Sequence, residues 1–202
     1  MGSEYNQYNP LDKVHLGESV RDALLRQPVR PLPPAEKFDG AGIYAIYYVG
    51  DFPAYSRIAE RNRNDRLEAP IYVGEAVREG SRTGGLVAES ITTSKLYERL
   101  RQHAKSIDQV ENLRLEDFSC RYLVVDDIWI PLGEALMIRS FSPLWNKIIP
   151  GFGIHDTGSR RIQTTSAWDT LHPGRHFVSK RKLPPNPKTQ EEWVRDVQQY
   201  LS

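Results

Sequence analysis

The sequence lacks the features that mark disulfide-linked, zinc-thiolate, membrane-spanning or secreted proteins. Cys120 is the only cysteine among 202 residues, so an internal disulfide and a zinc site built from several thiolates are both excluded. No apolar run approaches the roughly 18 residues that a membrane span requires, and residues 1–10 contain no apolar segment typical of a secretory signal. We therefore expect a chain with no membrane partner that works in a reducing, cytoplasmic compartment.

A large net charge is missing as well. The 27 basic and 26 acidic residues leave a formal charge of +1 at pH 7, so the overall charge does not indicate a nucleic-acid-binding protein. Two segments, 57–66 and 160–182, are locally rich in basic residues, which is consistent with a solvated surface or with two patches that contact phosphates. Charge alone favours the solvated surface. The basic residues of these segments are Arg57, Arg61, Arg63, Arg66, Arg160, Arg161, Arg175, Lys180, Arg181 and Lys182.

Hydrophobic periodicity predicts the secondary structure. Apolar residues spaced three and four apart indicate helices, and runs of β-branched and aromatic residues between glycines indicate strands. Residues 52–69 carry no clear period and are expected to form an exposed loop or a short helix, and residues 28–34 form a proline-rich extended connector. Helices are predicted over 12–27, 94–107 (with Ser94 as N-cap), 129–141 and 189–201, and strands over 43–49, 70–74 and 118–125.

The order of these elements predicts the fold class. Within residues 40–150 it is β-β-α-β-α, which suits a small α+β domain with a three-stranded antiparallel sheet flanked by helices. We divide the chain into an N-terminal helix and proline-rich arm (1–39), a core (40–158) and a basic C-terminal extension (159–202). The extension is expected to be irregular until its terminal helix.

Glu134 is the first candidate for chemistry. It is the only charged residue on the apolar face of the helix predicted over 129–141. A carboxylate on a core-facing stripe is costly unless it is paired, hydrogen-bonded or bound to a metal. Three interpretations stay open at this point: a metal ligand, a glutamate stabilised by the helix dipole, or the partner of a buried arginine.

Arg99 and His103 lie one turn apart on one predicted helix. A guanidinium suits phosphate oxygens, and an imidazole can take a proton near neutral pH, although such a pair taken alone more often belongs to a solvated surface. The predicted strands add Tyr44 and Tyr72, which are common strand residues. Together with Glu134, these residues are the components of a phosphodiesterase.

Two tripeptides connect these residues with a known family. Gly-Ile-Tyr at 42–44 and Tyr-Val-Gly at 72–74 resemble the paired signature of the GIY-YIG nuclease superfamily, with valine in place of the usual central isoleucine. In that superfamily an arginine on the first helix, a glutamate on a later helix and an asparagine in the loop beyond follow the signature. Arg99, Glu134 and Asn146 occur here in that order.

The text around Asn146 is similar to one branch of this superfamily. The segments 143–146 and 151–156 resemble restriction endonucleases, in which the first tyrosine also has a histidine or lysine partner. His103 is our candidate for that partner. The resemblance covers about residues 40–150, and the arginine-rich insert between the two strands is longer than in the minimal domain.

The resemblance implies hydrolysis with one metal ion in each site. Glu134 would hold a single Mg²⁺, for which Mn²⁺ can substitute, with waters in the remaining positions. Arg99 would contact the non-bridging oxygens of the scissile phosphate, where charge develops. Asn146 would position the metal carboxylate or its own loop.

Proton transfer would be the task of the tyrosines and His103. Tyr44 would be the general base that accepts the proton of the attacking water, and His103 would take the phenolic proton. A free phenol has a pKa of about 10, so the nearby cation and metal are expected to favour the phenolate. Tyr72 would orient the water or the phosphate, and the roles of the two tyrosines are exchangeable.

The restriction branch implies a bacterial type II endonuclease that acts on double-stranded DNA. One site cuts one strand, so a homodimer would match a palindrome, and the relatives imply a short GC-rich target of the CCGCGG kind. The terminal segments are expected to form the dimer contact and a clamp, with basic residues reading the major groove. The predicted DNA-binding residues are Arg57, Arg61, Arg63, Arg66, Arg160, Arg161, Lys180 and Arg181.

Other functions are compatible with parts of this pattern. A repair or homing enzyme would be expected to carry the domain in a longer chain. A non-catalytic DNA-binding module would be expected to lose Arg99 or Glu134, and both are present. A small-molecule enzyme of the α+β class is excluded only by the resemblance.

Overall fold

A four-stranded antiparallel sheet forms the centre of the fold in the computed structural model, which describes residues 9, 12–78, 93–154 and 164–202. The strand order is β1-β4-β2-β3, and β2 pairs with both β3 and β4. The three predicted strands and the α+β class are confirmed, whereas the expected strand number is wrong. The strand that was missed lies in the proline-rich connector, which is extended and pairs with the outer edge of β4. The bounds are β1 Arg30–Pro31, β2 Gly42–Tyr48, β3 Tyr72–Ala76 and β4 Phe118–Val124.

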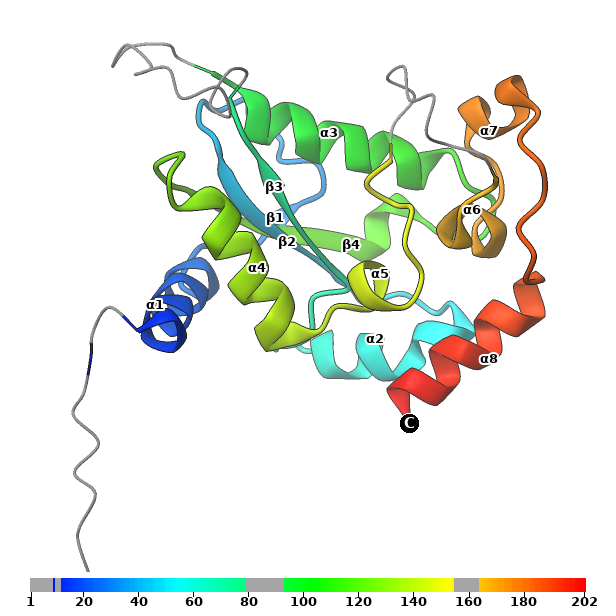
Figure 1. The fold of residues 1–202 in the computed structure, drawn as a ribbon, viewed down its shortest axis with the longest axis horizontal. Helices are drawn as coiled ribbons and strands as arrows, with labels where there is room; N and C mark the ends of the chain where they lie inside the picture. The colour runs from blue at the N-terminus through cyan, green and yellow to red at the C-terminus, as the bar shows by residue number, and fades with distance from the viewer. Residues whose placement is uncertain (1–8, 10–11, 79–92, 155–163) are drawn as a thin grey trace, which may run out of the picture.

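Helices cover the sheet and form most of the C-terminal extension (Figure 1). The four predicted helices are present, but the Ser94 side chain makes no capping hydrogen bond, since its hydroxyl donates to the Glu98 carboxylate at 3.0 Å. The extension is also more regular than expected, because two short helices precede the last one. Within the described ranges, no helix is long and apolar enough to cross a membrane. The helices are α1 Lys13–Leu25, α2 Ser56–Asn62, α3 Lys95–Asp108, α4 Ile130–Phe141, α5 Leu144–Lys147, α6 Ala167–Leu171, α7 His176–Arg181 and α8 Gln190–Leu201, with short 3₁₀ turns at Pro53–Tyr55 (η1) and Leu115–Asp117 (η3).

Both faces of strand β2 are buried, and a different helix packs on each face. All seven of its residues are buried, and successive side chains point to opposite faces of a strand. Tyr44 shares one hydrophobic cluster with Leu96 and Leu100 of α3. Ile43 shares the other cluster with Met137 of α4. The sheet therefore places α3 on the Tyr44 face and α4 on the opposite face.

A buried polar network joins the C-terminal extension to the core. The Trp145 indole donates to the Tyr55 hydroxyl at 3.0 Å, and that hydroxyl lies 2.6 Å from Nε2 of His172. Nδ1 of His172 lies 2.8 Å from the Asn112 side-chain oxygen. Burial, together with the positive charge of Arg175, lowers the pKa of His172 from 6.5 to about 3. The imidazole is therefore neutral in the folded protein and has partners on both nitrogens.

The His172→Gln variant should lose less stability than wild type when the pH is lowered. The unfolded chain binds a proton at His172 below pH 6.5, whereas the folded chain does not until about pH 3. The stabilising contribution is therefore complete above pH 6.5 and falls by about 1.4 kcal/mol for each pH unit below that value. In urea unfolding at pH 7 and pH 5, wild type should lose about 2 kcal/mol more than His172→Gln. The exposed His176→Gln variant is the matched control, and equal losses in wild type and His172→Gln would contradict the assignment.

Candidate active site

The Tyr44 and His103 side chains form a buried hydrogen-bonded pair between β2 and α3. The Tyr44 hydroxyl lies 2.6 Å from Nε2 of His103, and neither side chain is more than 1% exposed. Helical periodicity places His103 on a polar face, but the structure buries it completely. The interpretation of His103 as a solvated surface residue is therefore wrong, and its expected partnership with the first tyrosine is observed.

The surroundings of Tyr44 determine which of the two groups holds the proton. Burial, and then the neighbouring Tyr72, raise the pKa of Tyr44 well above 10, while the positive charge of Arg99 acts in the opposite direction. The expected effect of a nearby cation is present, but burial outweighs it. Tyr44 is therefore a neutral phenol whose hydroxyl shares a hydrogen bond with Nε2 of His103.

Tyr72 and Glu134 complete the cluster. The Tyr72 ring centroid lies 6.2 Å from that of Tyr44 and 5.2 Å from that of His103. Burial, and then the negative charge of Glu134, raise the pKa of Tyr72 to about 12, and Arg99 opposes this shift. Because Glu134 and Arg99 influence both tyrosines, the structure brings five of the six predicted catalytic residues together in one electrostatically coupled group.

The glycines of the two tripeptides have steric roles beside this group. Gly74 lies directly opposite Tyr44 in the β2–β3 pair, and a Cβ atom there would be 2.3 Å from the Tyr44 hydroxyl. A Cβ atom on Gly42 would be 2.0 Å from the carbonyl oxygen of Leu123. The tyrosine ring and the sheet can therefore occupy these positions only because no side chain is present.

Asn146, the sixth predicted residue, clamps the edge of the sheet. Its side-chain oxygen accepts a hydrogen bond from the Val73 backbone N–H at 2.9 Å, and its amide nitrogen donates to the Val73 carbonyl at 2.8 Å. The backbone N–H of Trp145 donates to the Ile71 carbonyl at 3.0 Å. Because β3 is an edge strand, these groups of α5 replace a neighbouring strand. Asn146 thus positions the strand that carries Tyr72.

Arg99 borders an open groove of about 280 Å³ between α3 and the end of β3. It is half-buried, and its guanidinium donates to the Gln102 side chain at 3.3 Å. Glu75 lines the same groove, and its negative charge also raises the pKa of Tyr72. Sequence periodicity did not single out Glu75, because charged residues are common near the end of an edge strand. The groove therefore brings Arg99 to an accessible surface, beside Lys95 and the carboxylates of Glu75 and Glu98.

Phe152 is a second residue that pattern analysis missed. Its ring stacks on His103 at 4.5 Å and lies 5.0 Å from the Tyr72 ring. The loop that carries Phe152 is held by Arg175, which donates to the carbonyls of Gly151, Phe152 and Ile154 at 2.8–3.2 Å. The wall that covers His103 is therefore fixed by a residue of the C-terminal extension.

The charge of Arg175 is balanced by a buried carboxylate. Asp169 accepts two hydrogen bonds from the guanidinium, at 2.5 and 2.6 Å, and both side chains are almost fully buried. Removing one partner of a buried ion pair leaves an uncompensated charge and is strongly destabilising. The position of the loop therefore depends on this pair.

Comparison with protein families identifies this arrangement. The sequence model of the Eco29kI GIY-YIG domain matches residues 36–201. The chain belongs to the Eco29kI GIY-YIG family. The predicted membership of the restriction branch is thereby confirmed. The match includes α8 and the five clustered residues, Tyr44, Tyr72, Arg99, His103 and Glu134. A search of curated proteins found no match.

GIY-YIG nucleases act on DNA and generally use divalent metal ions, and the described residues of this GIY-YIG chain fit such an ion. Glu134 is half-buried on α4 and close enough to the tyrosines to raise their pKa values. Carboxylate oxygens suit Mg²⁺, which commonly takes one or two carboxylates together with waters and substrate phosphates. Glu134 is therefore the residue that would hold the metal.

The predicted DNA-binding arginines of the insert lie away from the catalytic cluster of this GIY-YIG domain. Helix α2, which carries Arg57 and Arg61, lies with α8 on the opposite side of the molecule from α3 (Figure 1). Arg57 donates to the carbonyls of Leu201 and Ser202 at 2.9 and 2.8 Å, and Arg66 donates to backbone carbonyls within the insert. Any contact of the insert with DNA would therefore be remote from the Tyr44–His103 pair.

Two of the four predicted DNA-binding residues of the C-terminal extension lie among the described residues. Arg160 and Arg161 lie outside the described residues. Lys180 and Arg181 form the end of α7, and Lys180 is exposed. Their predicted contacts with DNA stay predictions.

Substituting Asn146 should loosen β3 selectively. Loss of the two hydrogen bonds to Val73 in Asn146→Ala should cost about 1–3 kcal/mol, so the Val73 amide should exchange its hydrogen about ten- to a hundredfold faster. Asn146→Asp keeps the acceptor for that amide and should have an intermediate effect. Hydrogen exchange measured by NMR checks this expectation, with the amides of β2 as internal controls. Unchanged protection of Val73 in Asn146→Ala would contradict the clamp.

Proposed function

We propose that this chain is a type II restriction endonuclease that cuts both strands of a short, GC-rich palindrome in double-stranded DNA as a homodimer. The observation that carries the proposal is the buried Tyr44–His103 hydrogen bond beside Arg99 and Glu134. A neutral phenol in contact with an imidazole acceptor is a proton relay, and the adjacent groups suit a phosphate and a metal. The preference for GC-rich palindromes rests on the family resemblance.

The relay assigns a direction to each proton. The attacking water gives a proton to the Tyr44 oxygen while the phenolic proton moves to Nε2 of His103, because the raised pKa of Tyr44 disfavours a free phenolate. The water oxygen then forms a bond to phosphorus, the bond from phosphorus to the 3′ oxygen breaks, and the leaving oxygen takes a proton from solvent. The imidazolium afterwards returns its proton to solvent.

Arg99 and Tyr72 stabilise and orient the reacting phosphate. The Arg99 guanidinium lies on the open groove and contacts the non-bridging oxygens, where negative charge increases in the transition state. The Tyr72 hydroxyl remains protonated at neutral pH, since its pKa is about 12, and donates to the phosphate or the attacking water. Glu134 would hold Mg²⁺ or Mn²⁺, which would supply a positive charge for the leaving 3′ oxygen.

Replacing Glu134 with Gln should abolish DNA cleavage. The amide preserves the size of the side chain but removes the negative charge for the metal, a loss of several kcal/mol that corresponds to at least ~100-fold in rate. Wild type should convert supercoiled plasmid into discrete linear fragments with Mg²⁺ and leave it intact with EDTA. Glu60→Gln, an exposed change on α2, is the matched control. A wild-type rate in Glu134→Gln would remove Glu134 from the site.

The same plasmid assay tests the homodimer. Two coupled sites cut both strands in one encounter, so linear products should appear without long-lived nicked circles. A lasting accumulation of nicked circles would contradict the dimer. If folded wild-type protein bound diverse plasmids and cut none, the chain would be a non-catalytic DNA-binding module.

Disrupting the relay at either residue should slow the chemical step to a similar extent. Tyr44→Phe and His103→Ala should each reduce the single-turnover cleavage rate by about 10²- to 10⁴-fold. Because the two groups move one proton in sequence, the double variant should be no slower than the slower single variant. Tyr47→Phe is the control, because Tyr47 lies on the same strand but on the opposite face, where its hydroxyl accepts from Arg121. Multiplicative losses in the double variant would argue against a relay.

A further inference from the structure

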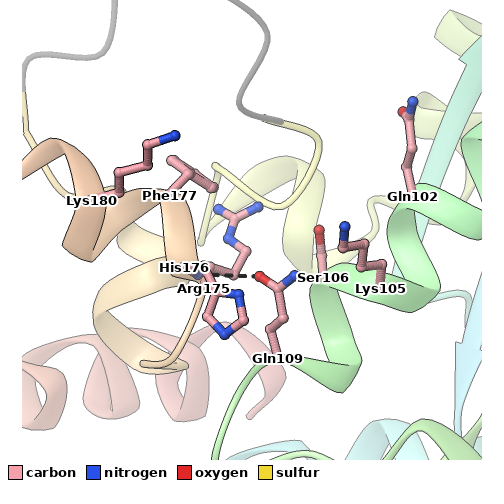
Figure 2. A pocket seen from close by; sticks show the side chains of 8 residues that line it. All are labelled: Gln102, Lys105, Ser106, Gln109, Arg175, His176, Phe177 and Lys180. Atoms are coloured by element: carbon pink, nitrogen blue, oxygen red, sulfur yellow. Dashed lines mark hydrogen bonds between the residues drawn. The ribbon is translucent and has the colours of Figure 1, made fainter.

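A second concave surface lies beside the catalytic cluster, between α3 and α7. This α3/α7 cleft has a volume of about 360 Å³. Figure 2 shows Lys105 of α3 and Lys180 of α7 on opposite walls, with Gln109 and His176 between them. None of the described residues that line the cleft is acidic. The cleft is therefore a polar hollow whose walls carry positive charge.

The charge available to a ligand comes from the two lysines. Arg175 also lines the cleft, but its guanidinium is bonded to Asp169 and to backbone carbonyls. Lys105 and Lys180 are exposed, and no ion pair is recorded for either among the described residues. A ligand with two adjacent negative charges would complement these walls.

The cleft adjoins the groove that contains Arg99. Gln102 lines both the cleft and the groove that contains Arg99. Lys105 is six residues beyond Arg99 on the same helix, which corresponds to about 9 Å along the helix axis. A DNA strand carries one phosphate for every ~3.4 Å of its axis. A strand with its scissile phosphate at Arg99 would therefore bring neighbouring phosphates to the cleft within a few nucleotides.

The two walls of the cleft are held together before any ligand binds. The backbone N–H of His176, at the start of α7, donates to the Gln109 side chain at 3.2 Å. Gly174 packs so closely on α3 that a Cβ atom there would be 2.3 Å from the Gln109 carbonyl oxygen. A preformed cleft binds its ligand with little cost of ordering.

We propose that the α3/α7 cleft binds the sugar-phosphate backbone of the substrate DNA beside the scissile phosphate. Lys105 and Lys180 contact phosphates from opposite sides, and the amide groups of Gln102 and Gln109 donate to phosphate or sugar oxygens. The proposal rests on the proposed nuclease function and deepens it. It assigns to α7 a direct part in substrate binding and identifies Lys105, which the charge pattern of the sequence did not single out.

The test compares two double variants, each of which loses two positive charges. Lys105→Gln/Lys180→Gln removes both cleft cations, and Lys13→Gln/Arg195→Gln removes two exposed cations on α1 and α8. Binding to a duplex cut by the wild type is measured in EDTA over a series of salt concentrations. Each lost phosphate contact lowers the slope of log affinity against log salt by about 0.9, so the cleft variant should lose about two units of slope and bind about tenfold or more weakly at low salt.

Cleavage measurements separate the possible outcomes. At saturating enzyme the cleft variant should lose less in single-turnover rate than it loses in affinity, because it retains Tyr44, Arg99 and Glu134. If wild type neither binds nor cuts DNA, the proposed nuclease function fails. If wild type cuts DNA but the cleft variant keeps the wild-type affinity and salt slope, or matches the α1/α8 control, the cleft proposal alone is overturned.

Discussion

The buried hydrogen bond between Tyr44 and His103 is the contact on which the catalytic cluster depends. It requires a space over Gly74 for the tyrosine, because any side chain there would collide with the phenol. It also requires α3 to pack closely on β2, which Leu96 and Leu100 ensure by their complete burial. Burial in turn keeps Tyr44 protonated. The packing of the core thus determines the protonation state of this phenol.

The signature residues are divided between chemistry and architecture. Gly42 and Gly74 leave room for the backbone and for the phenol, and Asn146 satisfies the outer edge of β3. Each of these three residues fixes the position of a neighbouring group. Replacing any of them should therefore disturb the site even if the residue does not contact a substrate. Arg99 and Glu134, by contrast, are partly accessible and supply charge. A reactive site held in one geometry before the substrate arrives avoids reorganisation during the reaction.

Local patterns predicted the elements that carry the reactive residues. Strands β2, β3 and β4 and helices α3 and α4 have clear periodicity, so their order and approximate bounds followed from the sequence. Helices α6 and α7 are too short for a periodic signal, and β1 depends on pairing with a strand almost ninety residues later in the chain. His103 is buried where its local pattern indicated exposure. Its helical position indicates a polar face, and the ring that buries it, Phe152, comes from a loop with no regular pattern.

The C-terminal extension is physically part of the catalytic unit. Arg175 and Asp169 lie beyond the boundary that we predicted at 158/159, yet Arg175 holds the carbonyls on either side of Phe152. His172 joins the same extension to the core through Tyr55 and Asn112. A buried charge with several partners has a single favourable position, because any displacement leaves polar groups unpaired. A loop fixed in this way gives the imidazole a rigid wall, so the extension helps to set the geometry of the hydrogen bond between His103 and Tyr44.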